Sequence, residues 1–72
     1  NPFAESLSVG NEGAPGALQV AELLDMRGRI LITGRFDGRV FVRLDTRSFP
    51  SGSYILRVRG ERECVTRMVV KR

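Results

Sequence analysis

The sequence contains no histidine and no tryptophan, and it has a single cysteine, Cys64, and a single lysine, Lys71. Zinc sites need clustered Cys and His ligands, and Ser-His-Asp or Cys-His catalytic groups need a histidine, so these sites are excluded. No apolar run approaches the roughly 18 residues that mark a membrane-spanning helix. In a chain of 72 residues, little length remains to build a substrate pocket around a pair of carboxylates. The sequence therefore favours a domain that is not an enzyme and uses no cofactor or metal.

The remaining reactive side chains have structural interpretations. Cys64 has no partner for an internal disulfide, and we interpret it as a small buried hydrophobic residue on a strand. Pairing between two chains is the alternative. Asp25, Asp37 and Asp45 fall in expected turns or at strand ends, where a carboxylate accepts hydrogen bonds from nearby backbone. A calcium site made by these three residues stays open as a minor alternative, although their spacing does not match the EF-hand loop.

Arginine supplies most of the positive charge, the net charge is +4, and the sequence pI is about 10.6. A guanidinium fork binds phosphate or carboxylate groups, which would suit an acidic partner. We favour the simpler explanation, in which the arginines keep the faces and edges of β-sheets soluble.

With 42% hydrophobic residues, the chain suffices for one domain with one thin core. Residues 1–5 include neither an initiating Met nor the basic and apolar segments of a signal peptide, so we expect a piece of a longer chain.

The strongest structural signal lies in residues 44–58. Leu44-Asp45 closes one strand, and Phe49-Pro50-Ser51-Gly52 forms a turn, because proline fixes φ at about −65° and glycine tolerates positive φ. Residues 54–58 then form a strand with one apolar row and one row rich in arginine. The apolar row holds Tyr54, Leu56 and Val58, and the other row holds Ile55, Arg57 and Arg59. We expect this strand at the centre of a sheet, with Phe49 at the end of the core.

Further alternating or apolar runs predict strands over residues 5–10, 17–24, 29–33, 40–44 and 64–70. A helix over 17–24 is the alternative. We choose a strand because Asp25-Met26-Arg27-Gly28 is typical of a type I turn with a glycine bulge between antiparallel strands. Asp37-Gly38 predicts a two-residue hairpin. The result is an all-β fold, an antiparallel sandwich or barrel of about six strands. Its expected core contains Leu7, Val9, Ile30, Ile32, Val42, Leu44, Tyr54, Leu56, Val58 and part of the last strand.

Four motifs, taken in order, resemble one known family. They are Asn1-Pro2-Phe3 followed by a Ser-Leu-Ser-Val strand, then Leu24-Asp25-Met26-Arg27-Gly28-Arg29-Ile30, then Leu44-Asp45 with Phe49-Pro50-Ser51-Gly52-Ser53-Tyr54 and Leu56-Arg57-Val58, and last Met68-Val69-Val70-Lys71-Arg72. Together they are similar to the C-terminal sorting domain of type IX secretion cargo from Bacteroidetes, over nearly the whole chain. Phe49 stands where Leu is commoner, Leu24 stands where Tyr is frequent, and Cys64 lies outside the pattern.

The resemblance implies an Ig-like antiparallel β-sandwich of about six to seven short strands. Residues 1–72 would form one sorting domain at the end of a larger exported protein. The resemblance also implies an N-terminally attached cargo, transit through the periplasm of a Gram-negative bacterium, and recognition by an outer-membrane translocon. A sortase-like peptidase often removes such a domain, and the cargo reaches the cell surface or the outside. The identity of the cargo and the fate of the domain stay open.

The sequence also suggests which residues act in sorting. We expect Val70, Lys71 and Arg72 to contact the machinery, because an exposed dibasic end offers charge without packing constraint. A frayed, solvated terminus without such a role is the alternative. The other motif residues have an expected architectural role: Asp25, Gly28, Arg29, Leu44, Asp45, Pro50, Gly52, Tyr54, Leu56, Arg57 and Val58.

Two other functions are consistent with a small basic β-domain. One is a generic Ig-like structural or adhesion module of a surface protein. The other is a β-barrel that binds single-stranded nucleic acid, for which Phe36 and Phe41 would supply stacking surfaces. These aromatic residues fall in or beside apolar rows and form no stripe among the arginines, so we expect no nucleic acid partner. Exchange of the first strand between two copies, which would give a homodimer, is left open.

Overall fold

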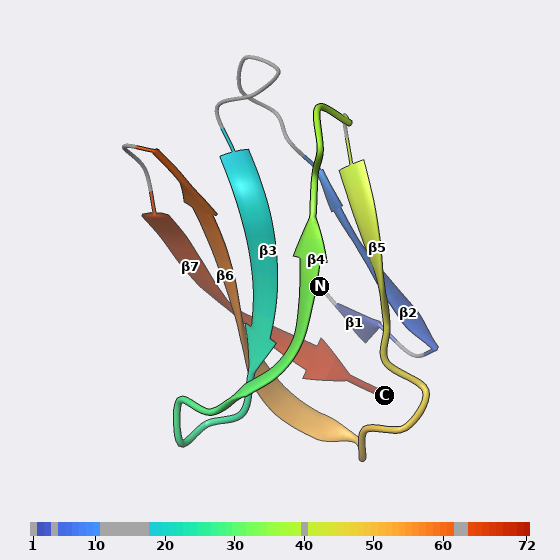
Figure 1. Cartoon of the computed structure of the whole chain (residues 1–72). Coiled ribbons are helices and arrows are strands. Elements are labelled where there is room, and N and C mark those ends of the chain that lie inside the picture. The colour runs from blue at the N-terminus through green and yellow to red at the C-terminus, as the bar shows by residue number, and fades with distance from the viewer. Residues whose placement is uncertain (1, 4, 11–17, 40, 62–63) are drawn as a thin grey trace.

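The structure is a computed structural model that describes residues 2–3, 5–10, 18–39, 41–61 and 64–72. These residues form seven strands in two sheets and contain no helix, which confirms the predicted all-β class (Figure 1). The strands are β1 (Pro2–Phe3), β2 (Ser6–Gly10), β3 (Leu18–Leu24), β4 (Ile30–Arg35), β5 (Phe41–Asp45), β6 (Gly52–Gly60) and β7 (Cys64–Lys71). The larger sheet has the order β1-β7-β6-β3-β4, and β2 pairs with β5 in the smaller one. An Ig-like sandwich is consistent with this arrangement.

Strand β6 lies at the centre of the five-stranded sheet, between β7 and β3, as the sequence predicts. All pairs are antiparallel except one, because β1 runs parallel to β7 with Pro2 opposite Val70 and Phe3 opposite Lys71. The other pairs confirm the predicted antiparallel fold. β1 and β7 come from opposite ends of the chain, so no hairpin connects them, and the sequence did not predict their pairing.

The core lies between the two sheets and is made mainly by β3, β6 and the inward residues of β2, β5 and β7. Its buried members are Val9, Ala21, Leu23, Phe36, Leu44, Tyr54, Val58 and Val69. One predicted core residue, Ile30, is instead exposed. The reason is a β-bulge: Leu23 pairs with Ile32 and Leu24 pairs with Ile30, which leaves Leu31 without a direct partner and turns Ile30 to the outer face.

The turn between β3 and β4 forms where the sequence predicts it. Asp25 Oδ1 accepts hydrogen bonds from the backbone N–H groups of Arg27 and Arg29, both at 2.9 Å. The N–H of Gly28 donates to the carbonyl of Asp25 at 3.0 Å, and Gly28 has a φ of 90°, which is in the region that favours glycine. Asp25 therefore fixes the turn through its side chain and its backbone together.

The second predicted hairpin, at Asp37-Gly38, has the expected turn but not the expected pairing. The φ values of 50° and 80° are those of a type I′ turn, and the N–H of Arg39 donates to the carbonyl of Phe36 at 2.9 Å. However, β4 pairs with β3, and β5 pairs with β2 in the other sheet. At Gly34 a Cβ atom would lie 2.7 Å from Leu44 Cδ2, so the absence of a side chain lets β5 pack over the face of β4. The turn thus connects two layers.

Candidate functional site: a corner built by the C-terminal strand

The chain between β5 and β6 folds into a compact turn at one end of the sandwich. The N–H of Phe49 donates to the carbonyl of Thr46 at 3.1 Å, so the hydrogen-bonded turn begins three residues earlier than the predicted one. The Phe49–Gly52 segment follows as a bend, and Gly52 has a φ of 147°. Asp45 Oδ1 accepts the N–H of Arg47 at 3.1 Å, and Asp45 Oδ2 lies 3.0 Å from the Arg47 guanidinium. This guanidinium lowers the pKa of Asp45.

Lys71 closes this turn from the end of β7. Its side chain points inward and the residue is only 8% exposed, so the prediction of an exposed dibasic end is wrong at this position. The ammonium group donates to the carbonyl oxygens of Thr46 and Phe49 and lies 3.5 Å from that of Arg47. Alternation along β7 places Lys71 on the same inner face as Val69, and an ammonium has three donors to meet these carbonyls. Burial of the charge is tolerated because its donors are satisfied.

Two aromatic side chains complete the same region. The hydroxyl of Tyr54 donates to the carbonyl of Pro50, and the rings of Tyr54 and Phe49 lie 6.3 Å apart between centroids. Phe49 packs against the core, as expected, and Tyr54 is buried in it. In the β6–β7 ladder Gly52 lies opposite Lys71, which joins the turn to the last strand. We name residues 45–54 together with 70–72 the C-terminal corner.

The solvent-facing residues of the corner include two of the three expected contact residues. Val70 is 47% exposed on the outer face of β7, and Arg72 is exposed beyond the end of the strand. The turn that contains Asp25, Gly28 and Arg29 lies at the same end of the sandwich (Figure 1). Leu44 and Val58 are buried in the core, and Leu56 packs against it. The structure thus brings parts of the third and fourth sequence motifs together in the C-terminal corner, with the turn of the second motif at the same end.

The comparison with known families decides what this domain is. Residues 1–72, the whole chain, match the family model described as the secretion system C-terminal sorting domain. The chain belongs to this family. No curated protein and no solved structure matches the chain.

The sorting domain is a C-terminal export signal for type IX secretion, as the four motifs predict. Membership implies that it interacts with the secretion machinery and carries an attached N-terminal cargo. It also implies export to the cell surface or the outside in Bacteroidetes. Domains of this kind are not known as catalysts.

An ion-pair cluster around a buried carboxylate, on the outer face of the sorting domain, was not predicted from the sequence. Glu22, on β3, is buried and lies opposite Arg57 on β6. Its Oε1 accepts from Arg57 Nε at 2.8 Å and from Arg59 Nε at 3.0 Å, and its Oε2 accepts from Arg59 Nη2 at 3.2 Å. The hydrogen bond from Arg57 lowers the pKa of Glu22, although burial acts in the opposite direction. The sequence contained one signal for this cluster. Glu22 is a single acid within an apolar strand, and β6 carries a row of arginines that could pair with it.

One residue of the sorting domain, Cys64, is more exposed than the sequence suggests. Cys64 is a free, exposed cysteine, so its interpretation as a buried hydrophobic residue is wrong. It is the first residue of β7, outside the cover of the small sheet. Of the two aromatic residues that the sequence places in or beside apolar rows, Phe41 is 58% exposed and Phe36 is buried in the core. Within the described residues, Asp25, Asp37 and Asp45 do not gather into a cluster that could hold a metal ion.

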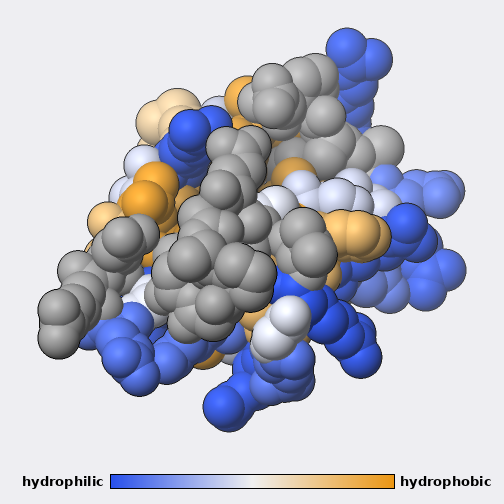
Figure 2. Space-filling model, turned by 90° about the horizontal axis from the view of Figure 1, so that it is seen from above, coloured by the Kyte–Doolittle hydropathy of each residue, from blue (hydrophilic) through white to orange (hydrophobic). Residues whose placement is uncertain are grey.

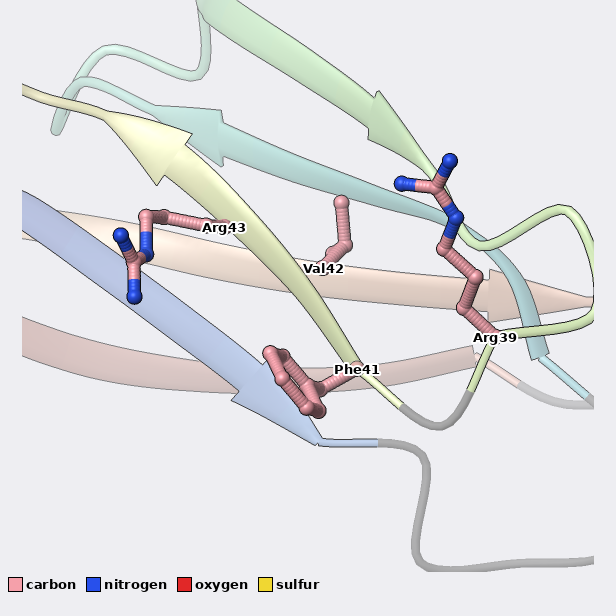
Figure 3. A pocket seen from close by; sticks show the side chains of 4 residues that line it. All are labelled: Arg39, Phe41, Val42 and Arg43. Atoms are coloured by element: carbon pink, nitrogen blue, oxygen red, sulfur yellow. The ribbon is translucent and has the colours of Figure 1, made fainter.

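An open hollow of about 530 Å³ on β5 is lined by Arg39, Phe41, Val42 and Arg43 (Figure 3). Phe41 and the two arginines come from one short segment, and a combination of aromatic and basic side chains is typical of nucleic acid binders. Proteins that bind single strands stack successive bases on several aromatic rings, whereas among the residues that line this hollow Phe41 is the one aromatic residue. The hollow therefore gives no support to that alternative over export.

Proposed function

We propose that the secretion machinery recognises this domain as a folded corner, in which Lys71 holds the surface together and Val70 and Arg72 touch the partner. The single observation behind the proposal is the set of carbonyl contacts of the Lys71 ammonium. These contacts connect the last strand to the 46–49 turn, so the signal depends on both segments at once. The partner in this proposal is the outer-membrane translocon of the type IX system.

The remaining steps of the proposal follow the family. Residues 1–72 form one sorting domain at the end of a larger protein, which passes through the periplasm before the translocon receives it. A sortase-like peptidase removes the domain at the cell surface. The domain itself performs no catalysis in this scheme. It acts only through the surface that the secretion machinery recognises. The family match gives no support to a generic adhesion module.

The test separates the positioning role of Lys71 from the contact role of Arg72. Residues 1–72 are fused to a periplasmic reporter in a bacterium with this secretion route, and the reporter is measured in the medium and the periplasm. Arg72→Ala should leave the Tm unchanged and reduce secretion. Lys71→Met should lower both the Tm and the secretion of the reporter. The buried carbonyl groups then lose their hydrogen-bond donor, at a cost of about 1–3 kcal/mol.

Two further variants serve as controls for this experiment. Lys71→Arg keeps a cation near the carbonyls and should recover part of the Tm and of the secretion. Arg67→Ala removes an exposed arginine from the same strand, away from the C-terminal corner, and should be secreted normally. Normal secretion of both Arg72→Ala and Lys71→Met would refute the proposed roles.

A further inference from the structure

In the described part of the chain, the outer edge of β7 is open over most of its length. β7 has eight residues, and among the described residues Pro2 and Phe3 of β1 pair with Val70 and Lys71 on this edge. Six residues, Cys64–Val69, therefore have no strand on that side within the part of the chain that the structure describes. On the other edge, β7 pairs with β6 over its entire length. Open edges offer unpaired N–H and C=O groups to any extended chain.

Most of the open part of β7 is also exposed on its faces, although Val69 at its end is buried in the core. The first five residues of the strand are all exposed, with Val65 at 45% and Met68 at 63%. The smaller sheet, β2 and β5, lies toward the other side of the molecule from the start of β7 (Figure 1). The segment contains no proline and one charge, that of Arg67. Such a strand is prone to pair with other chains unless something covers it.

Apolar side chains also reach the surface elsewhere, since Met26 is 53%, Ile30 47% and Phe41 58% exposed. On the face seen from above, apolar side chains lie among hydrophilic ones (Figure 2). β4 also has an open outer edge, of six residues, but among the described strands none lies on it, whereas β1 already lies on the edge of β7.

The chain already places one strand on this edge, and its direction indicates what occupies the rest. β1 runs parallel to β7, with Pro2 opposite Val70 and Phe3 opposite Lys71. Because parallel strands advance together, a polypeptide that continued this strand upstream of Pro2 would run along Met68 and, before that, along Cys64. The family attaches the cargo at the N-terminus, so this polypeptide is the cargo linker.

We propose that the linker between the cargo and Pro2 continues β1 as a parallel strand along Cys64–Val69. The inference rests on the proposed arrangement, in which a cargo precedes the domain. Covering six residues takes about 20 Å of extended chain, at about 3.3 Å per residue. Covalent attachment gives the linker an effective concentration in the millimolar range at this edge, which favours it over free strands. An acidic residue in the linker would form an ion pair with Arg67, because no described residue forms an ion pair with that guanidinium.

This arrangement would protect the edge for as long as the cargo is attached. Cutting the linker would expose the edge of the remaining domain. The linker is thus the partner of the β7 edge, and the C-terminal corner is left free for the secretion machinery.

Hydrogen exchange followed by mass spectrometry tests the proposal on two purified proteins, the full-length exported protein and residues 1–72 alone. The edge-facing amides within Cys64–Val69 should exchange about ten-fold more slowly in the full-length protein. The outward amides of β4, which forms the opposite edge of the sheet, should exchange equally in both proteins. Alkylation of the exposed Cys64 thiol, measured on its peptide, should slow in parallel.

A variant and its matched control identify the covering segment. Replacing the residues directly before Asn1 by a proline block removes their N–H groups and should abolish the protection. The same proline block placed farther upstream should leave the protection intact. Equal exchange in the two purified proteins would overturn the proposal, and protection that rises with protein concentration would do so too, by assigning the edge to a second copy. Secretion is not part of this measurement, so a failure of the proposed recognition through the C-terminal corner leaves its outcome unaffected.

Discussion

Replacing Glu22 by Gln removes the negative charge that two arginines share on the outer face of the large sheet. The Glu22 side chain is buried, and its two oxygens accept three hydrogen bonds, from Arg57 at 2.8 Å and from Arg59 at 3.0 and 3.2 Å. Gln has nearly the same shape, but it keeps one acceptor oxygen and turns an NH₂ group toward a guanidinium. The substitution therefore weakens all three bonds without leaving a cavity.

The size of the effect follows from these contacts and from the exposure of the partners. A hydrogen bond to a charged group contributes about 1.5–3 kcal/mol. The Arg57 side chain is a third exposed and that of Arg59 is half exposed, so solvent screens their charges and the three bonds do not add in full. We expect a loss of about 2 kcal/mol in the free energy of unfolding. For a domain of this size, that loss lowers the Tm by about 8–16 °C.

Thermal unfolding at neutral pH, followed by circular dichroism, measures this loss. Glu61→Gln is the matched control, because Glu61 is exposed and its substitution should change stability by no more than about 0.5 kcal/mol. The pKa of Glu22 lies below its ordinary value of 4.5. Its stabilising contribution is therefore complete above that pH and is lost as the pH falls through the lowered pKa. Equal Tm values for Glu22→Gln and Glu61→Gln would refute the reasoning.

Three further substitutions test the turns and the packing between the sheets. Gly52→Ala should destabilise by about 1 kcal/mol or more, because φ is 147° and strain alone opposes the new Cβ; an unchanged Tm would contradict this. Gly34→Ala should cost about 1–3 kcal/mol, because its Cβ would lie 2.7 Å from a side-chain carbon of the buried Leu44; a combined Leu44→Val change should recover part of the loss in urea unfolding. The pKa of Asp25 lies below 3.8 through the backbone hydrogen bond from Arg29, so its contribution is present above that pH and lost below it. Asp25→Asn should therefore flatten the acid limb of a stability–pH curve, and an identical limb would count against the turn geometry.

Features set by neighbouring residues were predictable from the sequence. The Asp25–Gly28 turn depends on a side chain and a glycine within one short segment, and both have the expected roles. The central position of β6 follows from its two-faced pattern. The family motifs also identified the function, which local physical chemistry alone does not provide.

Features set by distant contacts were not predictable in the same way. The Asp37-Gly38 turn has its local conformation, but the close approach of Leu44 to Gly34 decides which sheet β5 joins. The burial of Lys71 depends on carbonyl groups of a turn more than twenty positions earlier in the chain. The exposure of Cys64 depends on how little of β7 the small sheet covers. None of these is encoded in the immediate neighbourhood of the residue concerned.

The most direct test of the account is the location of a periplasmic reporter fused to residues 1–72, in a bacterium with a functional type IX system. We predict that the reporter appears on the cell surface or in the medium, and that removal of Lys71-Arg72 retains it in the periplasm. A reporter that stays in the periplasm when the intact domain is attached would contradict the central claim, that this folded surface is sufficient to direct export.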